Sequence, residues 1–286
     1  MKQLIEKANV LVEVLPYIKK FYGKTIVIKY GGSAMANEEL KKSVCLDIIL
    51  MKYVGISPVI IHGGGKEISG LMTQLGKQPK FFKGQRVTDA ETVKIVEMVL
   101  SGAINKEIVG IINTQGGNAV GLSGKDGNLI VAKKLGRGTL QRALTGAFSG
   151  EVKKINPEVI NLLDKEGFIP IISSVGLSED GFTYNINADS AAGEIACAVD
   201  AEKLIILTDT PGVLDKSGNL ISQLNRSKIK KLIKDGIIQG GMIPKIDAGL
   251  KALNGGVKKV HIVDGRITHS ILLEIMTDKG VGTEIV

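Results

Sequence analysis

Short apolar runs recur along the chain, each followed by small or polar residues and then by a segment with helical spacing of its apolar positions. The runs are rich in β-branched residues, which predicts buried strands at residues 25–30, 58–62, 168–173, 203–208 and 258–263. Helical periodicity predicts helices at residues 38–53, 67–75, 90–114, 157–166, 190–199, 228–235 and 269–276. Strands that alternate with helices indicate an α/β fold, with a largely parallel sheet and helices on both of its faces.

Two stretches depart from this alternation. Residues 80–87 predict a β-ribbon that turns at Gly84 and carries Arg86. Residues 119–153 are rich in glycine and contain short strand-like runs whose order the pattern leaves open. Farther along, Asn187 is placed to cap the helix at 190–199, and Pro244 suits the first turn of a helix that opens after Gly241.

The N-terminal segment, residues 2–21, has the pattern of a helix that lies outside the sheet. Its apolar positions alternate at spacings of four and three, and they are Leu4, Ala8, Leu11, Leu15 and Ile18. Such a narrow seam is typical of helices that pack on another helix, often across a subunit boundary. Pro16 falls inside the pattern and predicts a kink or break.

Composition narrows the class of protein. With 286 residues, 44% of them hydrophobic and 23% charged, the chain can bury the core of a large α/β domain or of two lobes. The net charge of +8 suits anionic ligands, but the absence of Trp and an aromatic content of 4% disfavour stacking on nucleic-acid bases. The densest lysine cluster, at 228–234, alternates with apolar residues as a solvated helix face does.

Cysteine usage and hydropathy indicate a cytoplasmic protein. Cys45 and Cys197 lie in apolar helical patterns without metal-ligand spacing, so we expect core residues in a reducing compartment. No apolar run approaches the ~18 residues that a membrane span needs. Charged residues interrupt the N-terminal apolar pattern, which argues against a signal peptide.

Two glycine loops follow predicted strands. The first strand ends in Lys29-Tyr30-Gly31-Gly32, and the second ends in His62-Gly63-Gly64-Gly65. Glycines let an anion approach backbone N–H groups, and the carboxyl edge of a parallel sheet is where ligands bind. The first loop alone is equally compatible with a strand whose lysine reaches solvent before an ordinary turn. The second loop favours a site for a ligand with several negative charges.

The remaining motifs favour phosphoryl transfer over other chemistry. The sequence has neither the P-loop signature nor the motif set of the protein kinases, and it has three histidines. No Ser–His–Asp pattern, reactive cysteine or metal-ligand cluster is evident. Phosphoryl transfer needs mainly positioning and charge neutralisation, which lysines and glycine loops supply.

Six dispersed motifs resemble, in order from about residue 8 to the end, those of the amino-acid kinase family. They are Ile28-Lys29-Tyr30-Gly31-Gly32, His62-Gly63-Gly64-Gly65, Gly84-Gln85-Arg86-Val87-Thr88, Asn185-Ile186-Asn187-Ala188-Asp189, Thr208-Asp209 and Gly241-Met242-Ile243-Pro244-Lys245. The resemblance implies a three-layer αβα sandwich around a mostly parallel sheet, preceded by a kinked helix. It also implies an oligomerisation helix at residues 1–22, an acyl-substrate lobe at 23–178 and a nucleotide lobe at 179–286, the two lobes sharing one continuous sheet.

Within the family the chain is similar to members that phosphorylate N-acetyl-L-glutamate in arginine biosynthesis. The implied reaction is ATP-dependent phosphorylation of the γ-carboxylate to N-acetyl-L-glutamyl 5-phosphate, a phosphotransfer to a carboxyl group. The resemblance further implies feedback inhibition by L-arginine and a homohexamer built as a ring of three dimers. Mg²⁺ would be held mainly by the ATP phosphates, with no protein metal site.

The resemblance assigns a role to each catalytic and substrate-binding candidate. Lys29 and Lys245 would flank the transferred phosphoryl group, and Asp189 would hold both lysines in place. Gly64 and Gly65 would present N–H groups to the attacking carboxylate. Arg86 would bind the substrate α-carboxylate, and Asn185 would hydrogen-bond the same substrate. Without the family context, Asp189 fits better as a first-turn helix carboxylate and Arg86 as a surface arginine. For Lys245, the neighbouring glycines and Pro244 favour a shaped loop over a solvated helix lysine.

Two further sets of residues are implied. The nucleotide-binding set is Gly31, Gly32, Thr208, Asp209, Gly212, Val213, Gly241, Met242 and Lys245, with the loop at 236–241 closing over the nucleotide. The set for allosteric arginine is Tyr17, His269, Glu274 and Gly280. Four places depart from the family's usual pattern, namely Lys66, Gln85, the stretch 145–149 and Met276.

Two alternatives stay open from the sequence. A related kinase could act on an acetylaminoadipate-type substrate that is one methylene longer, and a methylene carries only ~1–3 kcal/mol of discrimination. A non-catalytic nucleotide- or amino-acid-binding regulatory module could share the fold. The presence of Lys29, Asp189 and Lys245 together favours the enzyme, since a binding module has no need of the phosphoryl-neutralising pair.

Overall fold

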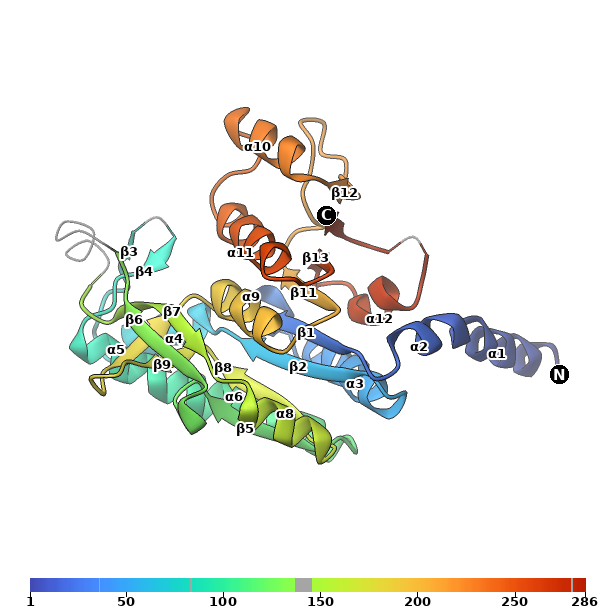
Figure 1. The fold of residues 1–286 in the computed structure, drawn as a ribbon, viewed down its shortest axis with the longest axis horizontal. Helices are drawn as coiled ribbons and strands as arrows, with labels where there is room; N and C mark the ends of the chain where they lie inside the picture. The colour runs from blue at the N-terminus through green and yellow to red at the C-terminus, as the bar shows by residue number, and fades with distance from the viewer. Residues whose placement is uncertain (36, 83, 137–145, 279) are drawn as a thin grey trace.

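An eight-stranded sheet forms the centre of the computed structural model, which describes residues 1–35, 37–82, 84–136, 146–278 and 280–286 (Figure 1). From edge to edge the strands are β12 (Gln223–Leu224), β14 (Thr283–Ile285), β13 (Lys259–Asp264), β11 (Lys203–Thr208), β1 (Thr25–Tyr30), β2 (Ser57–His62), β8 (Ile169–Ser173) and β5 (Ala119–Ser123). Every neighbouring pair is parallel except β13 and β14. The predicted sheet is confirmed, and the five predicted buried strands form β1, β2, β8, β11 and β13 of it.

Each face of the sheet has its own hydrophobic core, because neighbouring residues of a strand point to opposite sides. Ile26 and Ile28 of β1 pack into one core, whereas Val27 packs into the other. The first core is covered by α3 (Glu38–Tyr53), α6 (Asn105–Thr114) and α12 (Ser270–Ile275), and the second by α8 (Glu158–Lys165), α9 (Ala188–Ala198), α10 (Arg226–Lys234) and α11 (Met242–Asn254) (Figure 1). These layers confirm the expected αβα arrangement.

A small closed barrel lies beside the sheet and was not predicted. Its strands are β10 (Thr183–Ile186), β7 (Ser149–Ile155), β6 (Ile130–Lys134) and β9 (Val175–Leu177). Three of these strands are short, and the barrel closes through the pairing of β10 with the earlier β7, so local periodicity carried too little signal to order the strands. The predicted ribbon does form, as β3 (Phe81–Phe82) and β4 (Gln85–Arg86), with Gly84 at φ +77° in the turn.

The long helix predicted at 90–114 has a π-helical centre. It consists of α5 (Ala90–Glu97), the π-helix η2 (Met98–Ile104) and α6. A continuous α-helix was therefore the wrong prediction for residues 98–104. The apolar pattern continues through the π-helix, so periodicity alone could not reveal it. Shorter helices complete the chain: η1 (Gly32–Met35), α4 (Gly65–Gln74) and η3 (Asp126–Asn128).

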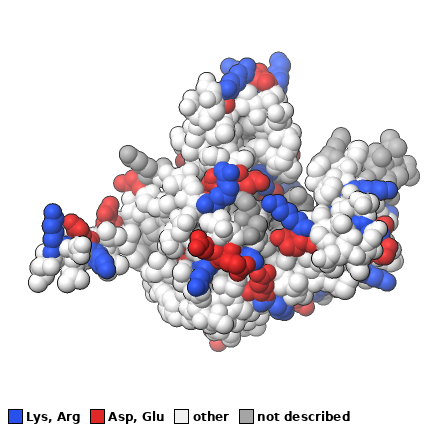
Figure 2. Space-filling model, turned by 180° about the vertical axis from the view of Figure 1, so that it is seen from behind, with Lys and Arg blue, Asp and Glu red and all other residues white. Residues whose placement is uncertain are grey.

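The N-terminal helices project from the body of the molecule (Figures 1 and 2). They are α1 (Lys2–Glu13) and α2 (Leu15–Phe21), bent by 28° at Val14, with Pro16 in the first turn of α2. The predicted kink is confirmed. No residue of α1 is buried, and Leu11 of the predicted seam is 70% exposed. The seam therefore has no partner within the described part of this chain.

The predicted lobe boundary falls between β9 and β10. Both strands belong to the barrel, while β11 continues the sheet directly from β1. The sheet thus runs through both predicted lobes, and the division into lobes stays a prediction. Cys45 is buried as expected, and burial raises the pKa of its thiol to about 12, whereas Cys197 is partly exposed. None of the described helices is long and apolar enough to cross a membrane.

Candidate active site

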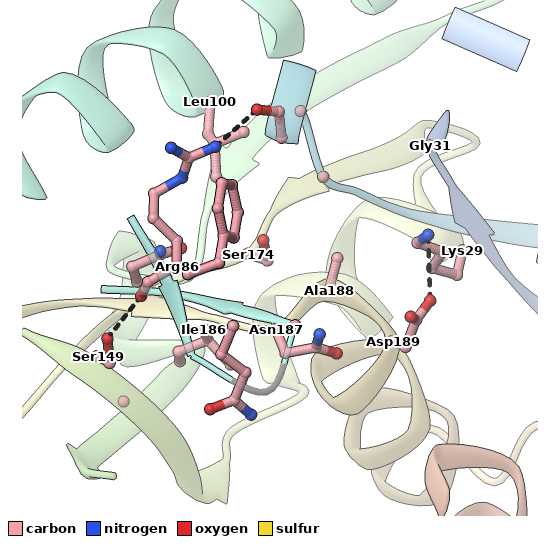
Figure 3. A pocket seen from close by; sticks show the side chains of 18 of the residues that line it. Lys29, Gly31, Arg86, Leu100, Ser149, Ser174, Ile186, Asn187, Ala188 and Asp189 are labelled. Carbon is pink, nitrogen blue, oxygen red and sulfur yellow. Dashed lines mark hydrogen bonds and ion pairs between the residues drawn. The ribbon is translucent and has the colours of Figure 1, made fainter. Parts of the chain in front are cut away.

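A cavity of about 230 Å³ lies at the carboxyl end of the central strands, where β1 and β2 meet the beginning of α9 (Figure 3). Both glycine loops line it, as do residues of the ribbon and of the barrel. Of the predicted residues, the lining includes Lys29, Gly31, Gly32, Gly64, Gly65, Arg86, Asn185 and Asp189. Segments that are far apart in the sequence therefore meet at one edge of the sheet.

Asp189 stands between two lysines. Its Oδ1 lies 3.1 Å from Nζ of Lys29, and its Oδ2 lies 3.1 Å from Nζ of Lys245. β1 delivers Lys29 to the sheet edge, and α9 places Asp189 in its first turn, where Asn187 caps the helix by accepting from Ser190 N at 3.0 Å. Lys245 comes from the first turn of α11. The three residues that the sequence singled out are brought together.

Electrostatics keeps Asp189 charged although it is buried. Burial by itself raises the pKa of Asp189, but the two ammonium groups outweigh burial and the pKa is lowered below its usual value. For Lys245 burial dominates, and together with repulsion from Lys29 it lowers the pKa against the pull of Asp189. Two cations share one anion here, so the group has a surplus positive charge that an anionic ligand would neutralise.

Arg86 supplies a second positive charge on the other side of the cavity, with Ala188 between it and the Lys29–Asp189 pair (Figure 3). Its Nη2 donates to Gly65 O and to Ser69 Oγ, both at 2.7 Å, and its guanidinium lies 4.8 Å from the ring centre of Phe81. Burial lowers its pKa. No carboxylate within the described ranges pairs with Arg86, which is 7% exposed. A buried cation without a counter-ion favours a ligand carboxylate or phosphate.

Asn185 and the second glycine loop complete the lining. Asn185 lies opposite Ser149 in the barrel and donates from Nδ2 to Thr88 Oγ1 at 3.1 Å. Gly65 is the first residue of α4, and a Cβ there would meet no atom within 4 Å. The N–H groups of this first turn lack intrahelical acceptors and carry the positive end of the helix dipole.

The predicted nucleotide residues divide between two cavities and their rim. Gly31 and Gly32 line the cavity just described. Gly212, Val213 and Met242 line a second cavity of about 470 Å³, within the size range of small-molecule sites (~300–1,000 Å³). The other predicted residues, Thr208, Asp209, Gly241 and Lys245, line neither, although Lys245 bonds to Asp189 at the first cavity.

Some lining residues were not predicted. Ser174 follows β8 at the same sheet edge, so the strand-end signal that marked Lys29 could have found it. Ser149 enters through the barrel and donates to Arg86 O at 3.0 Å. Leu100 comes from the π-helix. Neither Ser149 nor Leu100 has a local sequence signal, because tertiary packing alone brings them to the cavity.

The residues predicted to bind arginine are only partly brought together. Tyr17, Glu274 and Gly280 line a cavity of about 360 Å³ between α2 and the end of the chain. His269, predicted for the same site, does not line it. Its backbone is left-handed (φ +57°) where α12 begins, and its Nδ1 lies 2.5 Å from Asp47 Oδ1 on α3.

His261 of β13 lines this cavity instead, with Nδ1 2.5 Å from Glu274 Oε1. Glu274 also accepts from the N–H of Val281 at 2.8 Å. The sequence pattern placed His261 inside a core strand and so gave no reason to single it out. Among the described residues, no group of three or more His, Cys, Asp and Glu side chains is arranged to hold a metal ion.

Comparisons with known proteins agree with the fold. Residues 24–264 match the amino acid kinase family. The chain is 54% identical to an acetylglutamate kinase of Syntrophus aciditrophicus (strain SB), over 98% of this chain and 97% of that one. It is 56% identical to an acetylglutamate kinase of Aquifex aeolicus (strain VF5), over 100% and 99%.

Solved structures share the architecture. N-acetylglutamate synthase from Neisseria gonorrhoeae, complexed with coenzyme A and N-acetyl-glutamate, superposes with a TM-score of 0.86 at 26% identity over 98% of this chain. The chain spans 63% of the synthase, which is less than two thirds of its length. Carbamate kinase from Giardia lamblia bound to AMP-PNP shares the fold at 20% identity, with a TM-score of 0.67 over 92% of this chain and 98% of that one.

The lowered pKa of Asp189 predicts how stability responds to acid. A carboxylate with a depressed native pKa stabilises the fold fully above its unfolded pKa, and loses this effect as pH falls through the native pKa. The unfolding free energy of the wild type minus that of Asp189→Asn should therefore be constant above about pH 5 and shrink below pH 3.8, the ordinary value. Urea titrations at a series of pH values measure it, with the exposed Asp180→Asn as control. A difference that grows on acidification contradicts the assignment.

Proposed function

Because the chain belongs to the amino acid kinase family, we propose that it transfers the γ-phosphoryl group of ATP to the γ-carboxylate of N-acetyl-L-glutamate in arginine biosynthesis. The observation that carries the proposal is the pair of lysines joined by Asp189 in the same cavity as Arg86. Two separate positive regions suit a reaction between two anions. The identity of 54–56% to acetylglutamate kinases over nearly the whole chain supplies the substrate.

The chain's residues can perform this reaction without a general base, because a carboxylate is already ionised near pH 7. A γ-carboxylate oxygen attacks the γ-phosphorus in line, the bond from that phosphorus to the β-phosphate oxygen breaks, and ADP leaves. Negative charge spreads over the transferred oxygens in the transition state. Lys29 and Lys245 neutralise this charge from two sides, and Asp189 fixes the lysines at 3.1 Å on either oxygen.

The acyl substrate lies between the lysines and Arg86. The guanidinium of Arg86 takes the α-carboxylate as a two-pronged ion pair, while Asn185 hydrogen-bonds the same molecule. The N–H groups of Gly64 and Gly65 face the γ-carboxylate that becomes the acyl phosphate. Substrate orientation by Arg86 at one end places the reacting carboxylate at the other, beside the lysines.

The nucleotide spans both cavities. Gly31 and Gly32 approach its phosphates, and the cavity lined by Gly212, Val213 and Met242 takes the remainder of ATP. The positively charged side chains that line the first cavity suit the phosphates. Mg²⁺, when bound, is held by these phosphates and neutralises part of their charge. We also infer that residues 23–178 and 179–286 act as acyl-substrate and nucleotide lobes on the shared sheet.

The two alternatives differ from this proposal in testable ways. A substrate one methylene longer would use the same lysines and Arg86, so only relative turnover separates the two acceptors. A non-catalytic module would bind ATP without releasing ADP. An assay that couples ADP release to NADH oxidation, run with N-acetylglutamate and with N-acetyl-aminoadipate, tests all three. Parity or a preference for the longer acceptor would refute the substrate, and absence of ADP release would refute the enzyme.

Substitution of either lysine should mainly slow the chemical step. Lys29→Ala or Lys245→Ala removes charge that is needed most in the transition state, so kcat should fall about 10²-fold or more with a smaller change in KM. Arg86→Ala should instead raise the KM for N-acetylglutamate. Steady-state kinetics measure both effects, with the half-exposed Lys133→Ala as the matched control. Lysine variants with wild-type turnover would disprove these roles.

We further propose that L-arginine inhibits the enzyme by binding at the cavity between α2 and the chain end. Glu274, 6% exposed, offers a carboxylate to a cationic ligand, and Gly280 lets the ligand approach the backbone. Arginine can inhibit only by binding more tightly to a less active conformation of the enzyme. The bent α1–α2 helix beside the cavity is an element whose orientation can differ between the two conformations.

Activity should accordingly fall sigmoidally with arginine in the full-length protein. Glu274→Ala should abolish the inhibition because it removes the carboxylate that recognises the ligand. Initial rates at increasing arginine concentration measure the effect, and Glu166→Ala, on an exposed carboxylate outside the cavity, should remain sensitive. A wild-type enzyme that millimolar arginine leaves unchanged contradicts the proposal.

The exposed α1 supports a second proposal, that the protein is a hexamer built as a ring of three dimers joined by their N-terminal helices. Half or more of the surface of Leu4, Leu11 and Leu15 is exposed, and a copy of the helix is a matching apolar partner. Multi-angle light scattering should give a hexamer for the full chain and a dimer after deletion of residues 1–20. An unchanged mass after deletion would show that the helix does not join subunits.

A further inference from the structure

The Gly63–Gly64 peptide at the end of β2 has an unusual environment. It is trans, so its C=O and its N–H point in opposite directions. Gly63 O lies 3.1 Å from Nδ1 of His62, a side chain with no exposed surface. Within the described ranges the Gly64 N–H donates no hydrogen bond. The carbonyl thus faces the buried ring, and the N–H points away from it, on a loop that lines the active-site cavity.

Asn105 determines which nitrogen of His62 carries the proton. Its Nδ2 lies 2.9 Å from Ile171 O and 3.2 Å from Leu122 O, and a carbonyl only accepts, so the amide nitrogen must face them. The same Nδ2 lies 3.1 Å from His62 Nε2. The Nδ2 group only donates, and its two hydrogens serve three acceptors, so one hydrogen is shared and Nε2 accepts. This leaves the proton of the ring on Nδ1, where it is donated to Gly63 O. Burial lowers the pKa of His62 to about 4, so the ring is neutral at pH 7.

The π-helix explains how one segment reaches both the histidine and the loop. The N–H of Asn105 donates to Leu100 O, a bond across five residues, which brings Asn105 back to the side of the helix that Leu100 occupies. A Cβ on Gly64 would lie 2.1 Å from Ile104 Cδ1 and 2.9 Å from Leu100 Cδ2. The π-helix therefore packs directly on Gly64, while Asn105, the residue that follows it and begins α6, meets His62.

Gly121 of β5 makes room for this arrangement. A Cβ at position 121 would lie 1.9 Å from Asn105 Oδ1, so only glycine leaves space for the amide beside the strand. Asn105 has no exposed surface and connects α6 to β2, β5 and β8 through one side chain. A buried polar network of this kind specifies one orientation of its members.

We propose that His62 and Asn105 are positioning residues that aim the Gly64 N–H at the acyl group receiving the phosphoryl. The proposal rests on the proposed function for the identity of that group. Neither side chain touches substrate. Asn105 selects the His62 tautomer, His62 holds the Gly63 carbonyl, and the planar peptide turns the N–H of Gly64 toward the cavity. A donor that is aimed before the reaction needs no reorganisation as charge develops.

Kinetics of matched variants test the proposal. His62→Leu removes both ring contacts. We expect kcat to fall about 10–10²-fold, with KM for ATP within about twofold of wild type. Complete loss of an oxyanion donor lowers kcat ~10²–10³-fold, and a donor that is present but poorly aimed should lower it less. His62→Asn retains a donor near the Nδ1 position and should recover most of the lost turnover. Asn113→Leu is the control, because Asn113 also ties α6 to β5, through Ala119, but does not contact the loop.

Nitrogen-15 NMR of the ring gives a readout that does not depend on activity. In the wild type the shifts should show a protonated Nδ1 and an unprotonated Nε2, unchanged in Asn113→Leu. A wild-type ring protonated on Nε2 would overturn the proposal even if every variant failed to fold. A folded His62→Leu enzyme with kcat within threefold of wild type, or no worse than Asn113→Leu, would overturn it as well. Failure of the wild type to phosphorylate N-acetylglutamate would refute the proposed function. The His62 tautomer would still be decided by the NMR measurement, which does not depend on activity.

Discussion

The site depends on a single electrostatic constraint. Two ammonium groups lie close together in a buried place, and they need a carboxylate between them to offset their repulsion. Lys29 and Lys245 repel each other, and burial together with this repulsion lowers the pKa of Lys245. Asp189 resolves both problems because each of its oxygens lies 3.1 Å from one lysine. Removal of Asp189 would leave both ammonium groups without a counter-ion, and breaking a buried ion pair in this way typically costs about 3–5 kcal/mol.

The architecture meets this constraint by bringing three separate elements to one edge of the sheet. β1 is central, with β11 and β2 on either side, so its last residues open into the space that the neighbouring strands leave at their carboxyl ends. α9 and α11 pack against each other on one face of the sheet, which lets their first turns present Asp189 and Lys245 side by side. The cores on both faces hold these elements rigidly enough to keep the geometry.

Charge is distributed so that the site remains incomplete without an anion. The lysine pair keeps a surplus positive charge, and Arg86 is buried on the opposite side with neutral partners, Gly65 O and Ser69 Oγ. Glycines between the two positive regions expose backbone N–H groups where side chains would otherwise lie. The arrangement selects for molecules with negative charge at two separated points, and this selection is independent of which family member the chain resembles.

The sequence by itself determined β1, β2, β8, β11 and β13, the bounds of α3, and Lys29 as a candidate at a strand end. These features have local signals: β-branched runs, helical periodicity, and glycines at strand ends. Asp189, Lys245 and Arg86 became candidates through the motif resemblance. The motif resemblance then supplied the chemistry. Tertiary structure alone decided the barrel, because its closure pairs Asn185 of β10 with Ser149 of β7, which lies much earlier in the chain.

It also decided the π-helix, since the apolar spacing across residues 98–104 does not differ enough from that of an α-helix to predict a change of hydrogen bonding. The two histidines near the chain end show the same limit. His269 is turned toward Asp47 by a left-handed backbone, while His261 reaches Glu274 from inside a strand. Periodicity reports which side of an element is buried. It cannot report which distant polar group a buried side chain meets, because that depends on how whole elements pack.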